Sequence, residues 1–381
     1  MPPAARLRKA DVQELRRRIQ LLPSTLDIYV TNRCNLSCSY CSAKELTAQE
    51  QKTLPLETVL RAVDLYASYL SPSVRRACGT EPCGPPAVNF TGGEPFLAYD
   101  VMRSTAEYVR RRYPWMKVSV ATNGTLLEAS QVGPLLDLGM LISVSMDGCK
   151  RANDTHRKLR DDPGASAYDA VVRRLRALPP DQMSRIDAGV TMTSATMVHL
   201  VETLTCLRDL GFRRICLNFE TSEPWDAGKL RLLEKIVSSV NADVRERYLS
   251  EIADFPRSPG FRLSDVYFEV NSNYREQDQL TRELILGLDG VFLPSHLVWG
   301  ETEKRYQLGT LEHGVDFDRL RAVYDEVRSH ATPDDPYNIY PSLDRYFSAL
   351  SKGLDPKAAL EEGYRAGKIV ASLFGDRKSV V

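Results

Sequence analysis

Short β-rich runs alternate with longer amphipathic stretches along residues 25–225, and this alternation restricts the fold of the chain more than any other feature. The predicted helices are Glu57–Tyr69, Phe96–Arg112, Leu127–Leu138, Tyr168–Ala177 and Thr196–Leu210. The six predicted strands are Leu26–Val30, Ala87–Thr91, Lys117–Thr122, Leu141–Met146, Ala188–Met192 and Arg214–Phe219. Strands that are joined by crossover helices run parallel, and functional groups gather at their C-terminal ends. The pattern therefore predicts an α/β fold with a parallel sheet.

The two ends of the chain show other patterns. Residues 1–23 carry one apolar stripe among arginines, which predicts an amphipathic helix that docks on the body of the protein or contacts an acidic partner. Residues 24–225 are predicted to form the main domain, and residues 226–381 a smaller α+β cap. The elements expected in the cap are Trp225–Glu251, Phe261–Val270, Gly290–Val298, Asp316–His330, Leu343–Ser351 and Asp355–Phe374.

Composition and charge narrow the class of protein. The chain has 381 residues with 50 basic and 50 acidic side chains, so its net charge is zero. That balance argues against a strongly basic nucleic-acid-binding domain. No stretch reaches the ~18 apolar residues of a membrane span, and Met1–Arg8 lacks the apolar core of a secretion signal. We therefore expect a cytoplasmic protein that binds neither nucleic acid nor membranes.

Three of the eight cysteines stand close together after the first predicted strand. Cys34, Cys38 and Cys41 have C-x3-C-x2-C spacing on the loop that leaves this strand. Three thiolates on one short loop can bind three corners of a cubane 4Fe–4S cluster and leave the fourth iron open. A zinc knuckle or plain buried cysteines are the alternatives, but knuckles usually pair two C-x2-C units and the chain has no second one. The spacing favours one cluster with three cysteine ligands.

The cysteine run and the strand before it resemble the signature of the radical S-adenosylmethionine (SAM) superfamily, whose members have a partial (β/α)6 barrel. Three later motifs strengthen the resemblance, because each follows a predicted strand. Asn89–Pro95 resembles the GGEP motif of that family, and Ala121–Thr125 resembles its TNG element. Val144–Gly148 together with Asn153–Arg157 resembles the S-x-D-G…H-x-x-R region of the peptide-modifying branch.

The resemblance implies a role in SAM binding for residues of each motif. Gly92 and Gly93 would let the backbone approach the ligand closely, and Glu94 would receive the ammonium of the methionyl group. Ser145 and Arg157 would hold the methionyl carboxylate. An aromatic side chain near adenine is expected at Tyr40, for which plain packing is an equal alternative. The complete set implied for cofactor binding is Tyr40, Gly92, Gly93, Glu94, Thr122, Asn123, Ser145, Asp147, Arg157, Thr191 and Leu217.

The reaction that the resemblance implies begins at the open iron of the cluster. The amino and carboxylate groups of SAM would chelate this iron, and an external one-electron donor of the flavodoxin or ferredoxin type would reduce the cluster. Cleavage of SAM would release a 5′-deoxyadenosyl radical that abstracts hydrogen from an unactivated carbon, while the protein excludes water and aims the radical.

The expected substrate is a peptide or an amino-acid-derived natural-product precursor. This expectation follows from the resemblance to the peptide-modifying branch. A small molecule (an aminosugar, a nucleoside or a free amino acid) is the first alternative. A non-catalytic iron–sulfur sensor is the second, but a sensor has no need for SAM-binding residues at Glu94, Ser145 and Arg157.

The predicted cap resembles a degenerate SPASM or twitch domain, in which related enzymes bind auxiliary clusters. Its outline is visible in Gly287–Ser295 and Tyr306–Thr310, but no cysteine lies beyond Cys216, and Ser295 stands near an expected ligand cysteine. Serine oxygen is a poor substitute for thiolate on iron. We therefore expect no auxiliary cluster and favour a redox-neutral reaction. Because about 25 residues precede the first strand, a leader peptide is expected to need a separate recognition protein or the cap itself.

Several other polar residues have both a functional and a structural interpretation. Cys149 and Cys216 could donate a hydrogen atom to a substrate radical, or simply pack. Cys78 and Cys83 are interpreted as ordinary loop thiols, and the alternatives are that they form a labile disulfide or bind an accessory metal. Asp289 stands in an Asp-Gly turn and is either a turn residue or a substrate-facing acid. No two of the five histidines have the spacing of a metal-binding pair.

Overall fold

The computed structural model describes residues 25–70, 86–212, 214–220, 226–236, 283–296, 298, 300–330 and 340–362. The predicted helix within residues 1–23, the strand predicted at Phe261–Val270 and the loop with Cys78 and Cys83 lie outside the described residues. All six strands predicted for the main domain lie within the described residues.

A single sheet of ten strands forms the centre of the described structure, in the order β10-β9-β8-β7-β1-β2-β3-β4-β5-β6. The first six strands along the chain are parallel neighbours. They are β1 (Thr25–Thr31), β2 (Ala87–Gly92), β3 (Lys117–Thr122), β4 (Leu141–Ser145), β5 (Ile186–Met192) and β6 (Ile215–Phe219). The predicted strands begin and end within about two residues of these, so the parallel α/β sheet is confirmed.

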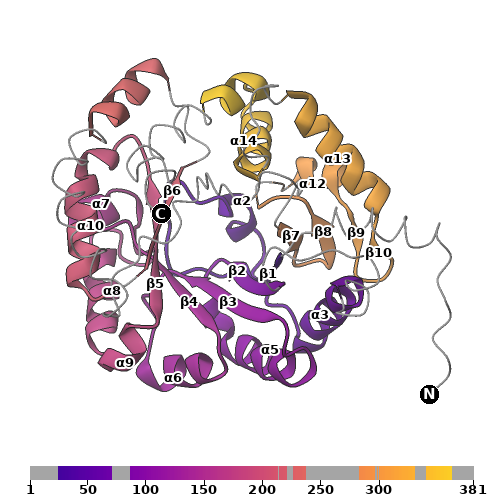
Figure 1. Ribbon diagram of the computed structural model, residues 1–381, viewed down its shortest axis with the longest axis horizontal. Coiled ribbons are helices and arrows are strands. Elements are labelled where there is room, and N and C mark those ends of the chain that lie inside the picture. The colour runs from indigo at the N-terminus through magenta and orange to yellow at the C-terminus, as the bar shows by residue number, and fades with distance from the viewer. Residues whose placement is uncertain are drawn as a thin grey trace, which may run out of the picture.

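Helices follow the parallel strands and cover the outer side of the curved sheet (Figure 1). The longer ones are α3 (Leu56–Leu70), α5 (Tyr99–Arg112), α6 (Ala129–Asp137), α8 (Ala167–Arg176) and α10 (Leu200–Asp209). Short elements between them are α2 (Lys44–Thr47), η1 (Pro95–Ala98), α7 (Lys150–His156), α9 (Pro180–Met183) and η2 (Met197–His199). The sequence does not predict α7, because its seven largely polar residues show no helical periodicity.

Along each parallel strand, successive side chains point in turn toward the outer helices and toward the inner side of the sheet. The residues on the helix side are apolar and almost fully buried, as at Val88, Val120 and Val144. The parallel register places the opposite set in rows across neighbouring strands, such as Asn89 beside Ser119, whose hydroxyl donates to the Asn89 side chain at 3.1 Å. The inner side therefore offers the polar groups that a charged ligand needs.

The strands of the predicted cap extend the same sheet beyond β1. The first of them, β7 (Glu283–Leu286), pairs in parallel with β1. Three antiparallel strands follow: β8 (Val291–Leu293), β9 (Gly309–Thr310) and β10 (Gly314–Val315). The strand predicted at Gly290–Val298 is therefore too long, and it ends before Pro294, which cannot donate a ladder hydrogen bond.

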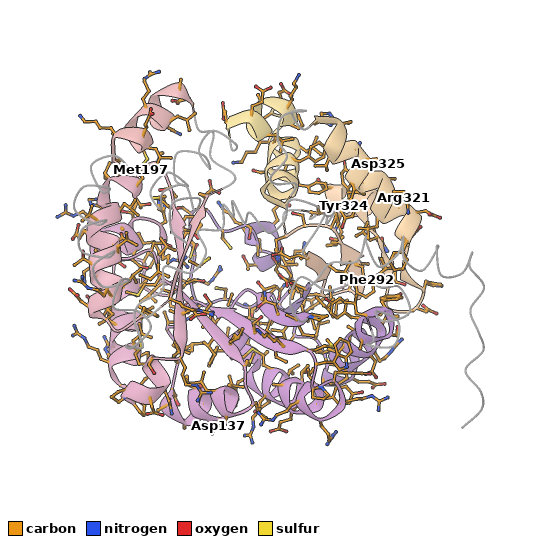
Figure 2. All side chains as sticks on the ribbon, viewed as in Figure 1. Asp137, Met197, Phe292, Arg321, Tyr324 and Asp325 are labelled. Atoms are coloured by element: carbon orange, nitrogen blue, oxygen red, sulfur yellow. The ribbon has the colours of Figure 1, made fainter. Side chains whose placement is uncertain are left out.

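The helices α12 (Glu301–Tyr306), α13 (Phe317–His330) and α14 (Tyr340–Ser351) accompany these strands. Phe292 of β8 and Tyr324 of α13, both labelled in Figure 2, are almost fully buried in the apolar core that they share with the main domain. A division of the chain near residue 225 stays a prediction, since one sheet and one core run across it. Among the described residues, no helix is both long and apolar enough to cross a membrane.

Candidate active site

Residues 32–41, here called the cysteine loop, begin at the end of β1 and are held by the segment that follows α7. The backbone N–H of Ser37 donates to the carbonyl of Lys158 at 2.8 Å. The Arg160 guanidinium donates to two loop carbonyls, at 2.9 and 3.0 Å. The backbone of the loop is therefore fixed by groups outside the candidate ligands.

The predicted cluster ligands Cys34, Cys38 and Cys41 are half-buried and form no disulfide. Burial raises the pKa of the Cys34 and Cys38 thiols to about 11 each, and that of Cys41 in the same direction. Three free thiols on one short loop are a donor set that fits a 4Fe–4S cluster, in which each thiolate binds its own iron and the fourth iron stays open.

Glu94 follows β2, is buried and is oriented by β3 and η1. Its Oε1 accepts from the Thr122 hydroxyl at 2.7 Å and from the backbone N–H of Phe96 at 3.0 Å. Its Oε2 accepts from the backbone N–H of Asn123 at 2.7 Å. Burial raises the pKa of Glu94, and these three donors oppose the rise. The carboxylate keeps lone pairs with which it can also accept from an ammonium group.

Gly92 and Gly93 are required by close packing against the end of β1 and the start of the cysteine loop. A Cβ atom on Gly92 would lie 2.3 Å from the carbonyl oxygen of Thr31, and one on Gly93 would lie 2.1 Å from that of Arg33. The N–H groups of Gly93 and Glu94 donate to these two carbonyls at 2.8 and 2.7 Å. The structure thus gives these glycines a close approach to protein backbone, and the close approach to a ligand that the sequence predicts stays a prediction. The glycines thus position the candidate cluster site.

A short series of side-chain hydrogen bonds joins the end of β3 to the cysteine loop. Asn123 Nδ2 donates to Asn35 Oδ1 at 2.8 Å, and Asn35 Nδ2 donates to Thr125 Oγ1 at 2.7 Å. Thr125 in turn donates to Asn123 Oδ1 at 2.6 Å. Through Glu94, the GGEP-like motif belongs to the same network. The loop and the two motifs therefore form one hydrogen-bonded unit, here called the motif network.

Asp147 and Arg157 form a buried ion pair beside the cysteine loop. Arg157 donates from Nε and Nη2 to the two carboxylate oxygens, both at 3.0 Å. Tyr40 donates its hydroxyl to the same carboxylate, and its ring centroid lies 5.4 Å from the guanidinium carbon. Burial tends to lower the pKa of Arg157, but Asp147 and Tyr40 outweigh it and raise the pKa. Arg157 stays charged and already has an anionic partner, so a SAM carboxylate would be its second.

The remaining predicted residues lie on β4, β5 and β6. Ser145 and Cys216 lie in one row across these strands. Thr191 of β5 donates its N–H to Asp147 Oδ1 at 2.9 Å. Leu217 pairs with Val190 of β5, and so lies in the row next to that of Ser145. The structure thus brings Thr191 to the buried ion pair and Cys216 into line with Ser145.

Cys149 directly precedes α7 and is buried. Its thiol lies near Glu202 and Cys206 of α10, and burial raises the pKa of this thiol. α10 belongs to the outer helical layer (Figure 1). Of the two predicted hydrogen donors, Cys149 therefore packs against an outer helix, whereas Cys216 shares a row with Ser145.

Two groups of polar residues are not predicted from the sequence. Asn35 and Arg160 fix the cysteine loop, and Asp27, Glu283 and His296 converge from distant positions. Linear spacing does not mark the second group, because His296 and Asp27 are 269 residues apart. For the first group there is one local signal. Asn35 directly follows Cys34, and asparagine side chains often form hydrogen bonds that fix a loop or turn.

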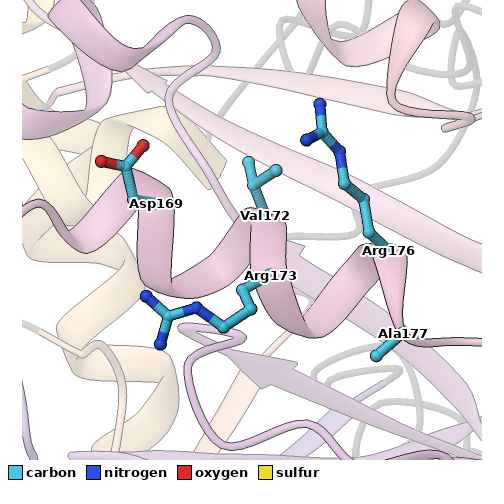
Figure 3. A pocket seen from close by; sticks show the side chains of 5 residues that line it. All are labelled: Asp169, Val172, Arg173, Arg176 and Ala177. Carbon is cyan, nitrogen blue, oxygen red and sulfur yellow. The ribbon is translucent and has the colours of Figure 1, made fainter.

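A hollow on the outer surface involves none of these residues. It is lined by α8 and the residue that follows it: Asp169, Val172, Arg173, Arg176 and Ala177 (Figure 3). No motif described above contributes to its lining. We assign no function to this hollow.

The class of protein follows from the sheet and from the motif network at the C-terminal ends of its first strands. Residues 28–210 match the family described as the Radical SAM superfamily. This part of the chain is a radical SAM domain, and the protein is a radical SAM enzyme. Enzymes of this family use a 4Fe–4S cluster and SAM.

Two curated proteins illustrate the sequence relationship. The chain is 26% identical over 254 residues to "Uncharacterized protein MJ0907" of Methanocaldococcus jannaschii, covering 65% of this chain and 78% of that protein. It is 36% identical over 171 residues to GTP 3′,8-cyclase 2 of Mycobacterium tuberculosis, covering 45% of this chain and 38% of the cyclase. The match to the cyclase thus spans well under half of that enzyme's length.

Two solved structures share the fold. The structure of native anSMEcpe with bound AdoMet has a TM-score of 0.65 at 16% sequence identity, covering 93% of this chain and 100% of that one. Streptococcus suis SuiB bound to the precursor peptide SuiA has a TM-score of 0.58 at 14% identity, covering 91% and 76%. At these identities the likeness shows the fold alone. It confirms the α/β partial barrel that the sequence predicts.

Proposed function

We propose that the chain binds one 4Fe–4S cluster through Cys34, Cys38 and Cys41, and cleaves SAM reductively at it. When bound, the two cofactors supply a 5′-deoxyadenosyl radical, which would abstract hydrogen from a peptide or an amino-acid-derived natural-product precursor. The observation that carries this proposal is the motif network, which ties the cysteine loop to the ends of β2 and β3. Groups gathered at the C-terminal ends of parallel strands are suited to share one ligand.

The chain's own residues would bind and orient SAM. Glu94, held by donors from β3 and η1, would accept hydrogen bonds from the ammonium. Ser145 and Arg157 would bind the carboxylate, while Asp147 fixes the plane of the guanidinium. Tyr40, anchored on Asp147, would pack near adenine. Thr191 and Leu217 would line the pocket beside them.

A peptide substrate is supported by fold neighbours. SuiB, which is similar to 91% of this chain in fold, is described with a bound precursor peptide. In this chain the cap or a separate recognition protein would hold the leader segment of such a peptide, and a flavodoxin or ferredoxin would deliver the electron. Cys216 is the better candidate than Cys149 for returning a hydrogen atom, because it lies in the row of Ser145.

A nucleotide is the second candidate substrate. The identity of 36% to a GTP 3′,8-cyclase favours it. That match covers 45% of this chain, so it supports shared cofactor chemistry more strongly than a shared substrate.

The cofactor part of the proposal is tested with anaerobically reconstituted protein. Wild type is expected to contain about four irons per chain and, with SAM and dithionite, to release 5′-deoxyadenosine detected by mass spectrometry. The Cys34→Ala, Cys38→Ala, Cys41→Ala triple variant is expected to do neither, whereas Cys206→Ala, outside the loop, is expected to do both. A wild type that binds the cluster but never cleaves SAM would support the iron–sulfur sensor instead.

The substrate part is tested by deuterium transfer. Perdeuterated candidate peptides and deuterated GTP are each incubated with reduced enzyme and SAM. Transfer of deuterium into 5′-deoxyadenosine from a peptide supports the first candidate. Transfer from GTP alone supports the second and rejects the peptide.

A further inference from the structure

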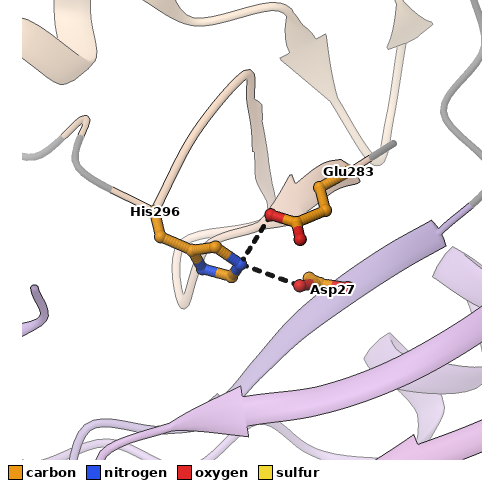
Figure 4. Close-up of side chains that lie close together, drawn as sticks. All are labelled: Asp27, Glu283 and His296. Carbon is orange, nitrogen blue, oxygen red and sulfur yellow. Dashed lines mark hydrogen bonds and ion pairs between the residues drawn. The ribbon is translucent and has the colours of Figure 1, made fainter. Parts of the chain in front are cut away.

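Three side chains outside the motif network converge where β7 and the turn after β8 meet β1. Asp27 comes from β1, Glu283 from β7 and His296 from the turn (Figure 4). One possible ligand atom from each residue lies within 4.8 Å of the other two. Within the part of the chain that the structure describes, no other three His, Cys, Asp or Glu side chains meet this criterion.

The imidazole of His296 contacts both carboxylates through a single atom. Nε2 lies 2.8 Å from Asp27 Oδ2 and 3.1 Å from Glu283 Oε2 (dashed in Figure 4). A ring nitrogen carries at most one hydrogen, so it cannot donate a full hydrogen bond to both oxygens. A cation between the three atoms would interact favourably with all of them.

The other ring nitrogen of His296 has a partner of the kind that metal-binding histidines use. Nδ1 lies 3.1 Å from the hydroxyl of Tyr29. Ligating histidines almost always donate their second ring N–H to an outer partner, which fixes the tautomer and the ring plane. With Nδ1–H donated to Tyr29, the lone pair of Nε2 points toward the two carboxylates.

Asp27 provides an independent observation. Its side chain is 3% exposed, and Oδ1 is buried with no hydrogen-bond partner. Such an unpaired buried oxygen is rare, because its lost hydration is not compensated. A metal ion would compensate it, since carboxylates bind cations through one or both oxygens.

The charges of the three residues also favour a divalent ion. Two carboxylates carry two negative charges, and a protonated imidazole between them would balance only one. A divalent ion bound by a neutral imidazole balances both.

We propose that Asp27, Glu283 and His296 bind one divalent first-row transition-metal ion, such as Zn²⁺. Imidazole together with carboxylate suits these ions, whereas Ca²⁺ and Mg²⁺ are bound mainly by oxygen. Three protein ligands leave a coordination position for water or a substrate oxygen. The ion joins β1 to β7 and to the turn after β8, and so ties the main domain to the predicted cap. It is independent of the proposed SAM chemistry.

Metal analysis of the reconstituted full-length protein tests this site. After incubation with Zn²⁺ and gel filtration, elemental mass spectrometry is expected to count one zinc per chain beside about four irons. His296→Gln is expected to lose the zinc and keep the iron. His313→Gln, at an exposed histidine in the turn before β10, is expected to keep both. Zn²⁺ is also expected to raise the Tm of the wild type and of His313→Gln, but not of His296→Gln.

Two results would overturn the proposal: a wild type that retains no zinc, or equal zinc retention by wild type and His296→Gln. Glu283→Gln replaces His296→Gln if the latter does not fold, and the wild-type count stands without either. The triple cysteine variant is expected to lose the iron and keep the zinc. Failure of the cluster and failure of this site therefore give different metal counts.

Discussion

At the residue scale, Asp147 and Arg157 show how this protein buries a pair of opposite charges. The side chains of Asp147 and Arg157 are 0% and 8% exposed and share two hydrogen bonds. Lys150 and Asp169 also form an ion pair, but about half of each side chain is exposed. Removing one member of a buried pair leaves an uncompensated charge, which costs far more than the loss of an exposed pair.

Breaking the buried ion pair is therefore expected to cause a large loss of stability. Arg157→Gln is expected to lower the free energy of unfolding by about 3–5 kcal/mol, because Asp147 is left without its countercharge. Lys150→Gln, the control at the exposed pair, is expected to cost less than about 1 kcal/mol. Urea denaturation followed by circular dichroism measures both. Equal losses in the two variants would contradict the role given to burial.

A substitution at Glu94 is expected to weaken the binding of SAM and to leave the binding of the cluster unchanged. Glu94→Gln removes the charge that would meet the ammonium, so the affinity for SAM is expected to fall about 10- to 100-fold, the usual value of a charged hydrogen bond. Iron content is expected to stay that of the wild type. Anaerobic equilibrium dialysis with labelled SAM measures the affinity, and Glu107→Gln at an exposed helix position is the control. Unchanged affinity in Glu94→Gln would argue against the contact.

At the scale of single elements, much of the main domain could be predicted from the sequence. Its parallel strands are short, rich in β-branched residues and separated by helices with clear apolar stripes, so their bounds follow from pattern. Two-residue strands such as β9 and β10 leave no such pattern. The contact between the GGEP-like glycines and the cysteine loop could not be predicted either, because the two segments are far apart in sequence and meet only in the folded chain.

The close contact at Gly93 predicts a loss of cluster binding. In Gly93→Ala the new Cβ would lie 2.1 Å from a carbonyl oxygen of the cysteine loop, so the loop must move. Iron content after reconstitution is expected to fall to less than about half of wild type, since ligand loops tolerate little displacement. Gly164→Ala is the control, because the nearest atom to its Cβ is a side-chain oxygen at 3.5 Å. Normal iron content in Gly93→Ala would refute this explanation.

At the scale of the whole molecule, the continuous sheet is the feature that sequence patterns did not reveal. The sequence predicts a cap that follows the main domain, whereas β7 pairs directly with β1 and shares its core. Pairing between strands more than 250 residues apart leaves no local signal. The same distance hides the convergence of Asp27 and His296. Long-range contacts, rather than motifs, are what the sequence could not supply.

The shared sheet predicts that the two parts do not fold separately. A chain that ends at residue 225 would expose the edge of β1 that β7 covers, and unpaired edges promote aggregation. Such a chain is expected to elute from size-exclusion chromatography as aggregate. Co-expression of residues 226–381 is expected to restore a soluble complex. A truncated chain that is monomeric and stable by itself would show that residue 225 is a true domain boundary.

The scaffolding around the cysteine loop bears on how such an enzyme is built and repaired in the cell. Arg160, Asn35 and the GGEP-like glycines hold the loop through contacts that include neither sulfur nor metal. Because these contacts do not depend on the cluster, the loop is expected to keep its conformation before an iron-delivery protein inserts the cluster. A chain that has lost its cluster to oxidation would then accept a new one and need not be degraded.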